Sequence, residues 1–346
     1  MHPVFRVGLT PDLLSATGST SLSDIGLGRL DQVPDLDYQF LPEGITELSR
    51  EHIHGYHALV MLGGRVSSSS LEGADNLTVL ARYGVGYDTI DIDACTRNGI
   101  AVTITPDGVR RPMATAIMTL VLALGSQLIP KDRLTRRGDW HEKRNYMGRG
   151  LTGRVLASIG YGNIARELFT LAEPFGMRHI AHDPFVAPEV APAVELMDLE
   201  TLFRTADYLI VNCALTPGTH HWVNAERLSL MKRTAFLINA AGGPIVDLVA
   251  LTEALTGGQI AGAALDVFEH EPVDVDDPLL ALDNLIVTPH ALGWTDEWMR
   301  LTGDSVSAGI VAVAAGREPL HVVNRSVLDT ALFRRKLSRH AIGRPA

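Results

Sequence analysis

The chain is poor in cysteine. Cys95 and Cys213 are the two cysteines among 346 residues, and they lie far apart in the sequence. This usage fits neither a disulfide framework nor the closely spaced ligands of a zinc site. We therefore expect no bound metal and a location in the reducing cytoplasm.

Long hydrophobic runs are also missing. The longest apolar stretch, MATAIMTLVLALGSQLI at residues 113–129, has 17 residues and contains Thr, Gly, Ser and Gln. A membrane-spanning helix needs about 20 predominantly apolar residues. The first residues, MHPVFRVGLTPD, show no charged segment followed by an apolar run and a small-residue cleavage site. We expect no membrane partner and no secretory signal, and we interpret residues 113–129 as a buried helix.

Positive charge is in deficit. The chain has 30 Lys and Arg against 40 Asp and Glu, which gives a formal net charge of −10. Nucleic-acid binders normally gather Lys and Arg on one face, so this balance disfavours DNA or RNA as a partner. Basic residues do gather at residues 133–144, RLTRRGDWHEKR, but Asp and Glu lie among them. We interpret this segment as a solvated loop or a contact between subunits.

The sequence does contain a regular alternation of strand and helix patterns, and 46% of its residues are hydrophobic, as in an ordinary globular protein. A first series of short β-branched runs occupies residues 4–10, 57–64, 77–84 and 100–106. A second and stronger series occupies residues 154–160, 178–183, 207–213, 234–240, 260–268 and 285–289. Strands separated by helix-length segments favour parallel sheets with crossover helices.

The predicted fold class is therefore α/β, with two doubly wound parallel-sheet, Rossmann-like domains and a cleft between them. The length of the chain also favours two domains. Residues 1–105 and 300–346 are predicted to form a discontinuous, flavodoxin-like domain, and residues 106–299 a Rossmann domain. In the second, Asn224 and Asp247 are N-cap candidates for helices, and Gly257 with Gly258 ends a helical pattern.

A glycine-rich motif predicts a dinucleotide site. In VLASIGYGNIARELF, Gly160, Gly162 and Ala165 match G-x-G-x-x-G/A between a predicted strand and a predicted helix. The first glycine permits a tight turn, the second lets the backbone approach a pyrophosphate, and the small third residue allows close packing. Asp183 ends the next predicted strand, where a carboxylate can accept a hydrogen bond from an adenosine ribose 2′-hydroxyl. It would repel a 2′-phosphate, so the motif predicts NAD, including NADH, and disfavours NADP.

These motifs belong to a longer series, through which the chain resembles the NAD-dependent D-2-hydroxy-acid dehydrogenases, the family of phosphoglycerate, glycerate, formate and D-lactate dehydrogenases. The resemblance covers nearly the whole chain and rests on LTGRVLASIGYGNIA, DYLIVNCALTPGT, LSLMKRTAFLINAAGGPIVD, ALTEALTGGQIAGAALDVFEHEP and PLLALDNLIVTPH. It implies an oxidoreductase that transfers a hydride between nicotinamide and a carbonyl or hydroxyl carbon of a small 2-hydroxy- or 2-keto-acid-like molecule. It also implies that residues 106–299 bind NAD and that the other domain binds the substrate.

The resemblance implies two catalytic residues. His290 in VTPHALG matches the family's histidine, the acid that protonates the carbonyl oxygen during reduction. An imidazole suits this step because its pKa lies near neutral pH. Glu271 in DVFEHEP matches the glutamate that orients this ring and favours its charged form.

A third catalytic position differs from the family. The family carries an arginine in N-x-A/S-R-G-x-x-V-D, which clamps the substrate carboxylate and polarises the keto oxygen. Gly242 occupies this substrate-binding position in the sequence NAAGGPIVD. The change removes a planar, permanently charged donor whose hydrogen bonds to a carboxylate contribute about 1.5–3 kcal/mol each.

Four explanations for Gly242 stay open. Another arginine can supply the charge, with Arg110 and Arg111 in PDGVRRPMATA or Arg82 before YGVGYD as candidates. The substrate can lack the carboxylate or be bulkier, because glycine also empties space. The chain can be a catalytically silent NAD(H)-binding sensor or corepressor-like interaction protein, although it retains both His290 and Glu271. The glycine can also be an engineered substitution.

The resemblance implies further contacts. Val85 and Gly86 would offer amide hydrogens to a substrate carboxylate, and Asp266 would hold the nicotinamide amide. Asn163 and Ile164 would contact the pyrophosphate. Other cofactor contacts are implied at Cys213, Thr216, Ala240 and His290. The resemblance, together with the apolar helix at 113–129 and the loop after it, also predicts a homodimer.

Overall fold

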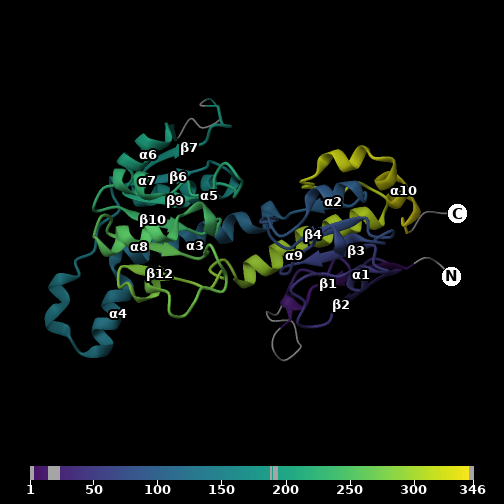
Figure 1. Cartoon of the computed structure of the whole chain (residues 1–346), viewed down its shortest axis with the longest axis horizontal. Coiled ribbons are helices and arrows are strands. Elements are labelled where there is room, and N and C mark those ends of the chain that lie inside the picture. Colours follow the sequence, from purple (N-terminus) through teal and green to yellow (C-terminus); the bar gives the residue numbers. More distant parts are fainter. Residues whose placement is uncertain (1–3, 15–23, 188, 190–193, 343–346) are drawn as a thin grey trace. The chain divides into compact units, whose positions relative to one another are not determined.

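The structure, a computed structural model, describes residues 4–14, 24–187, 189 and 194–342. The chain divides into two compact units, shown with their elements labelled in Figure 1. Unit 1 comprises Met1–Val109 and Trp294–Ala346, and unit 2 comprises Arg110–Gly293. The sequence predicts boundaries after residues 105 and 299, whereas the structure has them after Val109 and Gly293.

Unit 1 is built on a five-stranded parallel sheet in the order β2-β1-β3-β4-β5. The strands are β1 (Phe5–Leu9), β2 (Leu36–Phe40), β3 (Ala58–Met61), β4 (Val79–Arg82) and β5 (Ala101–Thr103). The helices are α1 (Arg50–Ile53), α2 (Ile92–Arg97), α9 (Asp296–Ala314) and α10 (Ala331–Arg339). Leu59 and Leu80 of the sheet share a buried cluster with Ile53 of α1 and Cys95 of α2, while α9 packs against β4.

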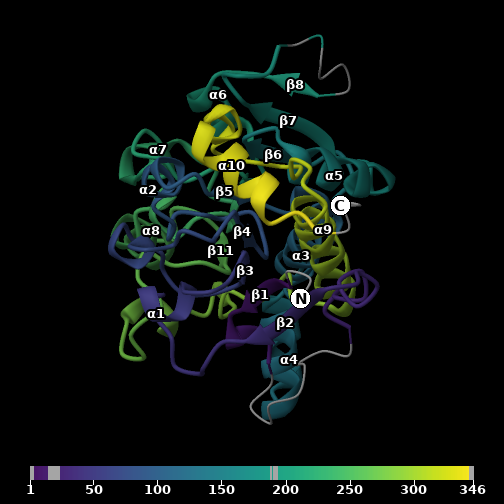
Figure 2. The same cartoon turned by 90° about the vertical axis from the view of Figure 1, so that its right-hand side faces the viewer.

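Unit 2 is built on a seven-stranded parallel sheet in the order β12-β11-β10-β9-β6-β7-β8. The strands are β6 (Val155–Ile159), β7 (Arg178–His182), β8 (Glu195–Leu196), β9 (Tyr208–Val211), β10 (Phe236–Asn239), β11 (Gly262–Leu265) and β12 (Leu285–Val287). The helices are α3 (Pro106–Ser126), which begins in unit 1, α4 (Leu128–Arg137), α5 (Asn163–Ala172), α6 (Leu199–Thr205), α7 (Ala225–Leu230) and α8 (Leu248–Thr256). Figures 1 and 2 both show α4 at the margin of this unit.

The sheet of unit 2 is covered on both faces because alternate residues of its strands point to opposite sides. Leu156 and Ile210 pack with Val121 of α3 and Leu168 of α5. The intervening strand residues form the second cluster with α6, α7 and α8, and its strand members include Ala157, Ile159, Leu209, Val211 and Leu237. Both faces being apolar explains why these strands read as nearly continuous hydrophobic runs in the sequence.

The structure confirms the predicted α/β class with two parallel-sheet domains. All ten predicted strands are present, and two strands were missed. β2, sequence LDYQF, and the two-residue β8 lie at sheet edges and are partly exposed. Edge strands need fewer apolar residues, so their sequences carry a weaker hydrophobic pattern. The predicted caps are confirmed, since Asn224 and Asp247 accept hydrogen bonds from the Arg227 and Ala250 amides, and Gly257 ends α8.

The apolar stretch at 113–129 is not one helix. α3 ends at Ser126, Gln127 takes a left-handed conformation with φ 55°, and α4 follows with a bend of 56°. The Lys131 ammonium donates to the Ser126 carbonyl at 2.7 Å, which satisfies an acceptor at the end of α3. No single helix within the described ranges is long and apolar enough to cross a membrane, although α3 and α4 taken together pass by length and composition.

Candidate active site

The turn after β6 has the geometry that a dinucleotide pyrophosphate needs. Gly160 has φ +96°, and a Cβ atom there would lie 2.9 Å from the Asn212 carbonyl oxygen. Gly162 is the N-cap of α5, and open space surrounds the position of its missing Cβ. Ala165 is fully buried where α5 meets the sheet. The turn therefore has room for a phosphate beside the positive end of α5.

Asp183, which follows β7, lies against this turn. One carboxylate oxygen accepts the Tyr161 amide at 2.9 Å, and the other accepts the Phe185 amide at 3.0 Å. A carboxylate has about four acceptor sites, so capacity for a ribose hydroxyl is left after these two bonds. Asn163 and Ile164 form the first turn of α5. The residues present therefore fit a dinucleotide.

Other predicted cofactor residues follow neighbouring strands. Cys213 and Thr216 lie in the loop after β9, and Ala240 comes directly after β10. Burial raises the pKa of the Cys213 thiol to about 11, with the charge of Asp183 contributing, so this group stays a neutral thiol at physiological pH. The Thr219 hydroxyl accepts the Thr216 amide at 2.8 Å and keeps this loop ordered.

His290 and Glu271 come together as a pair. His290 Nδ1 lies 2.7 Å from Glu271 Oε2, and Glu271 Oε1 accepts the Phe268 amide at 2.9 Å. Burial raises the pKa of Glu271, but the hydrogen bonds from His290 and Phe268 outweigh it and lower the pKa overall. The carboxylate therefore stays ionised and stabilises an imidazolium on His290. This is the arrangement that an acid catalyst requires.

Asp266 orders the loop that carries His290. Its Oδ1 accepts the Thr288 hydroxyl at 2.7 Å and the Ala291 and Leu292 amides at 3.0 and 3.1 Å. Burial raises the pKa of Asp266 above its usual value, and these hydrogen bonds offset part of that rise. The structure thus gives Asp266 a role in placing residues 288–292. The nicotinamide contact expected from the resemblance stays a prediction.

Gly242 lies in the turn after β10 and has an extended backbone, with φ −154° and ψ 123°. The Asn239 side-chain amide donates to the Gly242 carbonyl at 3.0 Å and holds this turn. A Cβ atom at residue 242 would lie 3.2 Å from Leu215 Cβ and from Ile245 Cδ1. The backbone therefore tolerates any residue, but a larger side chain requires these two neighbours to move by a few tenths of an ångström.

Arg82 lies at the end of β4 in unit 1, beside the loop of Val85 and Gly86. Its Nε donates to the Gly86 carbonyl at 2.7 Å, and Nη1 reaches the carbonyls of Met61 and Tyr83 at 3.1 and 3.2 Å. It also bonds the Leu62 carbonyl. Within the described part of the chain, the amides of Val85 and Gly86 donate to no protein acceptor. One guanidinium and two amides of unit 1 thus lie close to one another.

Arg110 and Arg111 already have a carboxylate partner. Arg111 Nη1 lies 2.8 Å from Glu167 Oε1 on α5, and Arg110 Nε lies 3.6 Å from Glu167 Oε2. Both arginines are about half exposed. A substrate anion would have to compete with Glu167 for either charge, which makes these two weaker candidates than Arg82 for replacing the missing arginine.

A second histidine–carboxylate pair was not predicted from the sequence. His221 Nε2 lies 2.5 Å from Glu269 Oε1, and His221 Nδ1 lies 3.9 Å from Asp247 Oδ2. The alternation Glu269-His270-Glu271 in DVFEHEP was the available signal, because it places two carboxylates two residues apart. The partner histidine lies 48 residues earlier, and no local pattern connects it to Glu269.

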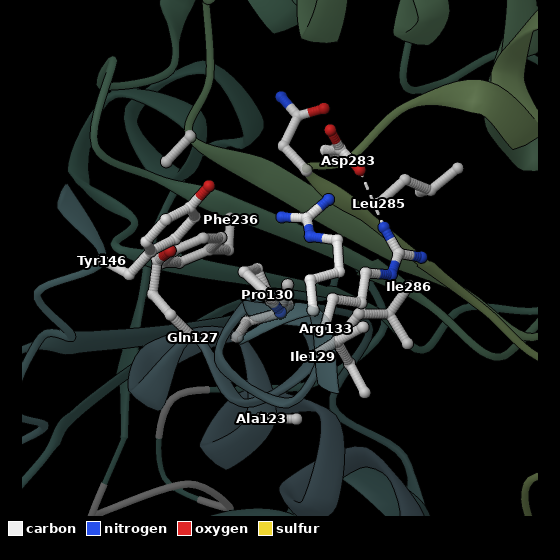
Figure 3. Close-up of a pocket in the computed structure, with 14 residues that line it drawn as sticks. Ala123, Gln127, Ile129, Pro130, Arg133, Tyr146, Phe236, Asp283, Leu285 and Ile286 are labelled. Carbon is white, nitrogen blue, oxygen red and sulfur yellow. Dashed lines mark hydrogen bonds and ion pairs between the residues drawn. The ribbon is translucent and has the colours of Figure 1, made fainter. Parts of the chain in front are cut away.

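Figure 3 shows a hollow at the amino ends of the strands of unit 2, opposite the carboxyl ends that the candidate active-site residues follow. It measures about 190 Å³ and is lined by Phe236 and Leu285, at the amino ends of β10 and β12, and by residues of α3 and α4. Arg133 points to Asp283 across it, at 2.8 Å. Nucleotides bind at the carboxyl ends of parallel strands, so this hollow is separate from the candidate active site. No group of three or more potential metal ligands occurs among the described residues.

A sequence profile of the D-isomer specific 2-hydroxyacid dehydrogenase NAD-binding domain matches residues 118–291. The chain belongs to the D-2-hydroxyacid dehydrogenase family. It is 36% identical to a glyoxylate reductase of Thermococcus onnurineus, over 82% of the chain and 87% of that protein. It is 40% identical to D-3-phosphoglycerate dehydrogenase of Methanocaldococcus jannaschii over 77% of its own length, but spans about half, 51%, of that protein.

Solved structures agree with this membership. The TT0316 protein of Thermus thermophilus matches with a TM-score of 0.80 and 32% identity, over 92% of this chain and all of that one. A glyoxylate reductase from Paecilomyes thermophila matches with a TM-score of 0.80 and 25% identity, over 94% of this chain and 99% of its own. The NAD-binding domain of the family therefore coincides with unit 2.

The two glycines of the turn after β6 can be separated by experiment. Gly160→Ala should lower the stability of unit 2 and weaken NADH binding, because its Cβ meets backbone atoms and its φ is left-handed. Gly162→Ala should leave the melting temperature unchanged but raise the Kd for NADH at least tenfold, because its Cβ would occupy space needed by the pyrophosphate. Thermal unfolding and NADH fluorescence titration measure the two effects. Unaltered NADH affinity in Gly162→Ala would argue against this turn as the pyrophosphate site.

Proposed function

We propose that the chain is an NAD-dependent oxidoreductase that interconverts a 2-keto acid and the corresponding 2-hydroxy acid. The observation that carries the proposal is the His290–Glu271 pair, 2.7 Å apart, in the unit that holds the dinucleotide turn. Asp183 at the end of β7 supports NAD over NADP, because it would repel a 2′-phosphate. When bound, the nicotinamide supplies or accepts the hydride.

The residues of the chain supply the proton and hold the substrate. In the reducing direction, His290 gives its proton to the carbonyl oxygen of the substrate, and in the oxidising direction it takes the hydroxyl proton. The Glu271 carboxylate keeps the ring oriented and stabilises its charged form. Asp266 places the loop on which His290 lies through its three hydrogen bonds.

The substrate carboxylate is proposed to bind Arg82 and the amides of Val85 and Gly86. Arg82 is held by four carbonyl oxygens, which fixes its guanidinium beside these amides. Two amides and a guanidinium make an anion site without a charge at Gly242. At Gly242 itself the turn is closely packed, because a Cβ atom there would lie 3.2 Å from Leu215 Cβ and from Ile245 Cδ1.

The first experiment measures NADH oxidation with a panel of 2-keto acids, aldehydes and ketones. We expect turnover with one or more 2-keto acids, and we expect His290→Gln to lower kcat at least 1,000-fold, since acid–base groups contribute about 10²–10⁴-fold. The Kd for NADH should stay within threefold of the original value. Tight NADH binding without turnover of any compound would contradict the enzyme and favour a sensor or corepressor-like protein.

A second experiment tests Arg82 together with Gly242. Arg82→Met should lower kcat/KM for the 2-keto acid by about 100-fold, or about 2.7 kcal/mol, mainly through KM. Arg111→Met is the matched control and should change it less than threefold, because Arg111 is bound to Glu167. In the Arg82→Met background, Gly242→Arg should recover part of the loss by returning a guanidinium. A KM that does not respond to Arg82→Met would exclude Arg82 as the carboxylate ligand.

We also propose a homodimer whose contact includes α3, α4 and the segment after α4. Leu122, Leu128, Trp140 and Met147 on these elements are 41, 55, 64 and 81% exposed. The neighbouring residues 133–144 carry both signs of charge, as a self-complementary two-fold contact requires.

Light scattering at micromolar concentration should therefore give twice the chain mass. The double variant Leu128→Glu with Trp140→Glu should give a monomer, because burying two carboxylates without partners is costly. Val249→Glu, on the exposed side of α8, is the control and should remain dimeric. A monomeric parent protein would overturn the proposal.

A further inference from the structure

The loop from Phe268 to Glu271 carries two carboxylates, and each holds a different histidine. Glu271 lies 2.7 Å from His290, and Glu269 lies 2.5 Å from His221. The loop also has a bond of its own, because Glu271 Oε1 accepts the Phe268 amide at 2.9 Å. A displacement of Glu269 would therefore move Glu271 and change its contact with His290.

The backbone of His221 is held in an unusual conformation. Its φ is +51°, and that of His290 is +53°. A non-glycine residue in the left-handed region costs on the order of 1 kcal/mol and persists where its surroundings determine it. At His221 the amide donates to the Pro244 carbonyl at 2.9 Å. Two residues later, the Val223 amide donates to the Ile245 carbonyl at 3.0 Å.

The turn after β10 also contacts the loop from Phe268 to Glu271 directly. A Cβ atom on Gly243 would lie 1.8 Å from the Phe268 carbonyl oxygen and 2.8 Å from the Glu269 nitrogen, so the two backbones touch. The loop is therefore attached at two points, one in the turn after β10 and one in the segment between β9 and α7, whose His221 amide is itself bonded to Pro244 of that turn. One is the backbone contact at Gly243, and the other is the His221–Glu269 pair.

We propose that His221 is a positioning residue for the reaction: it anchors Glu269 and thereby holds the loop in which Glu271 orients the His290 imidazole. The catalytic consequence rests on the proposed function. The anchoring itself does not, because it concerns the geometry of the Glu271–His290 pair in the free protein.

The charges around the two histidines suit this role. His221 faces the carboxylates of Glu269 and Asp247, and its ring stacks on His220 at 4.0 Å. Asp247 is also held, because it caps α8 through the Ala250 amide at 3.0 Å. His290 faces Glu271, and the charge of His290 also reaches Asp266. His221 thus connects Glu269 to a helix end that does not depend on the loop.

The test uses two variants, each of which removes one member of the His221–Glu269 pair. His221→Asn keeps a side chain that tolerates the left-handed backbone, and Glu269→Gln keeps the size of the glutamate. The pKa of His290 is measured by NMR titration, with its signal assigned by loss in His290→Gln. His220→Asn is the control, since its ring only stacks on His221.

If His221 positions Glu271, both variants should lower the pKa of His290, because both loosen the carboxylate that favours the charged ring. Each should also lower kcat about tenfold with little change in KM, and the double variant should be no worse than either single one. His220→Asn should leave the pKa of His290 and kcat unchanged.

Opposite shifts in the two variants would overturn the proposal, because they would show a through-space effect of each charge in place of anchoring. An unchanged pKa of His290 in both variants would also overturn it, even if stability fell. If the parent protein turned over no compound, the proposed function would fail, but the titration would still decide whether His221 positions the pair.

Discussion

The candidate active site depends on where the Glu271 carboxylate is held. Its two oxygens bind different partners, the Phe268 amide at 2.9 Å and His290 at 2.7 Å. One bond ties the side chain to its own loop, and the other sets the direction of the imidazole. An imidazole at the end of a strand would otherwise rotate freely in water, and proton transfer requires a defined direction.

Two neighbouring segments support this carboxylate. Asp266 is buried directly after β11 and accepts hydrogen bonds from Thr288, Ala291 and Leu292. These bonds fix the loop that carries His290. The Glu271 loop is held from the other side by Gly243 in the turn after β10 and by His221 in the segment between β9 and α7. The carboxyl ends of parallel strands meet at one edge of the sheet, and all these turns follow such ends. Residues that are distant in the sequence therefore lie close enough together to orient the His290 imidazole.

The fold of the turn after β10 does not require a glycine at position 242. Its backbone is extended and needs no glycine, and Asn239 holds the turn independently of the side chain at this position. The conformation of this turn therefore does not depend on which side chain residue 242 carries, although a side chain larger than glycine would lie against Leu215 and Ile245. Arg82 lies in unit 1 with its guanidinium fixed by four carbonyls, whereas Arg110 and Arg111 are bound to Glu167.

Much of the fold could be predicted because its signals are local. Predicted strands such as β6, β9 and β10 are mainly apolar and buried on both faces, and the caps Asn224 and Asp247 act within one helical turn. The strands β2 and β8 were missed because sheet edges need little apolar sequence. The break between α3 and α4 was missed because the residue in the left-handed conformation is Gln127 and not a glycine or an asparagine, although Gly125 and Pro130 lie close to the break.

The sequence by itself predicted the α/β class and the glycine-rich turn from neighbouring residues, and the resemblance to the family pointed to His290 and Glu271. The tertiary structure alone decided that Glu167 binds Arg110 and Arg111, that Arg82 binds the carbonyls of Met61 and Leu62, and that His221 holds Glu269. These contacts join residues up to 57 positions apart. The packing of strands and turns determines which residues make these contacts, and a local sequence pattern does not predict that packing.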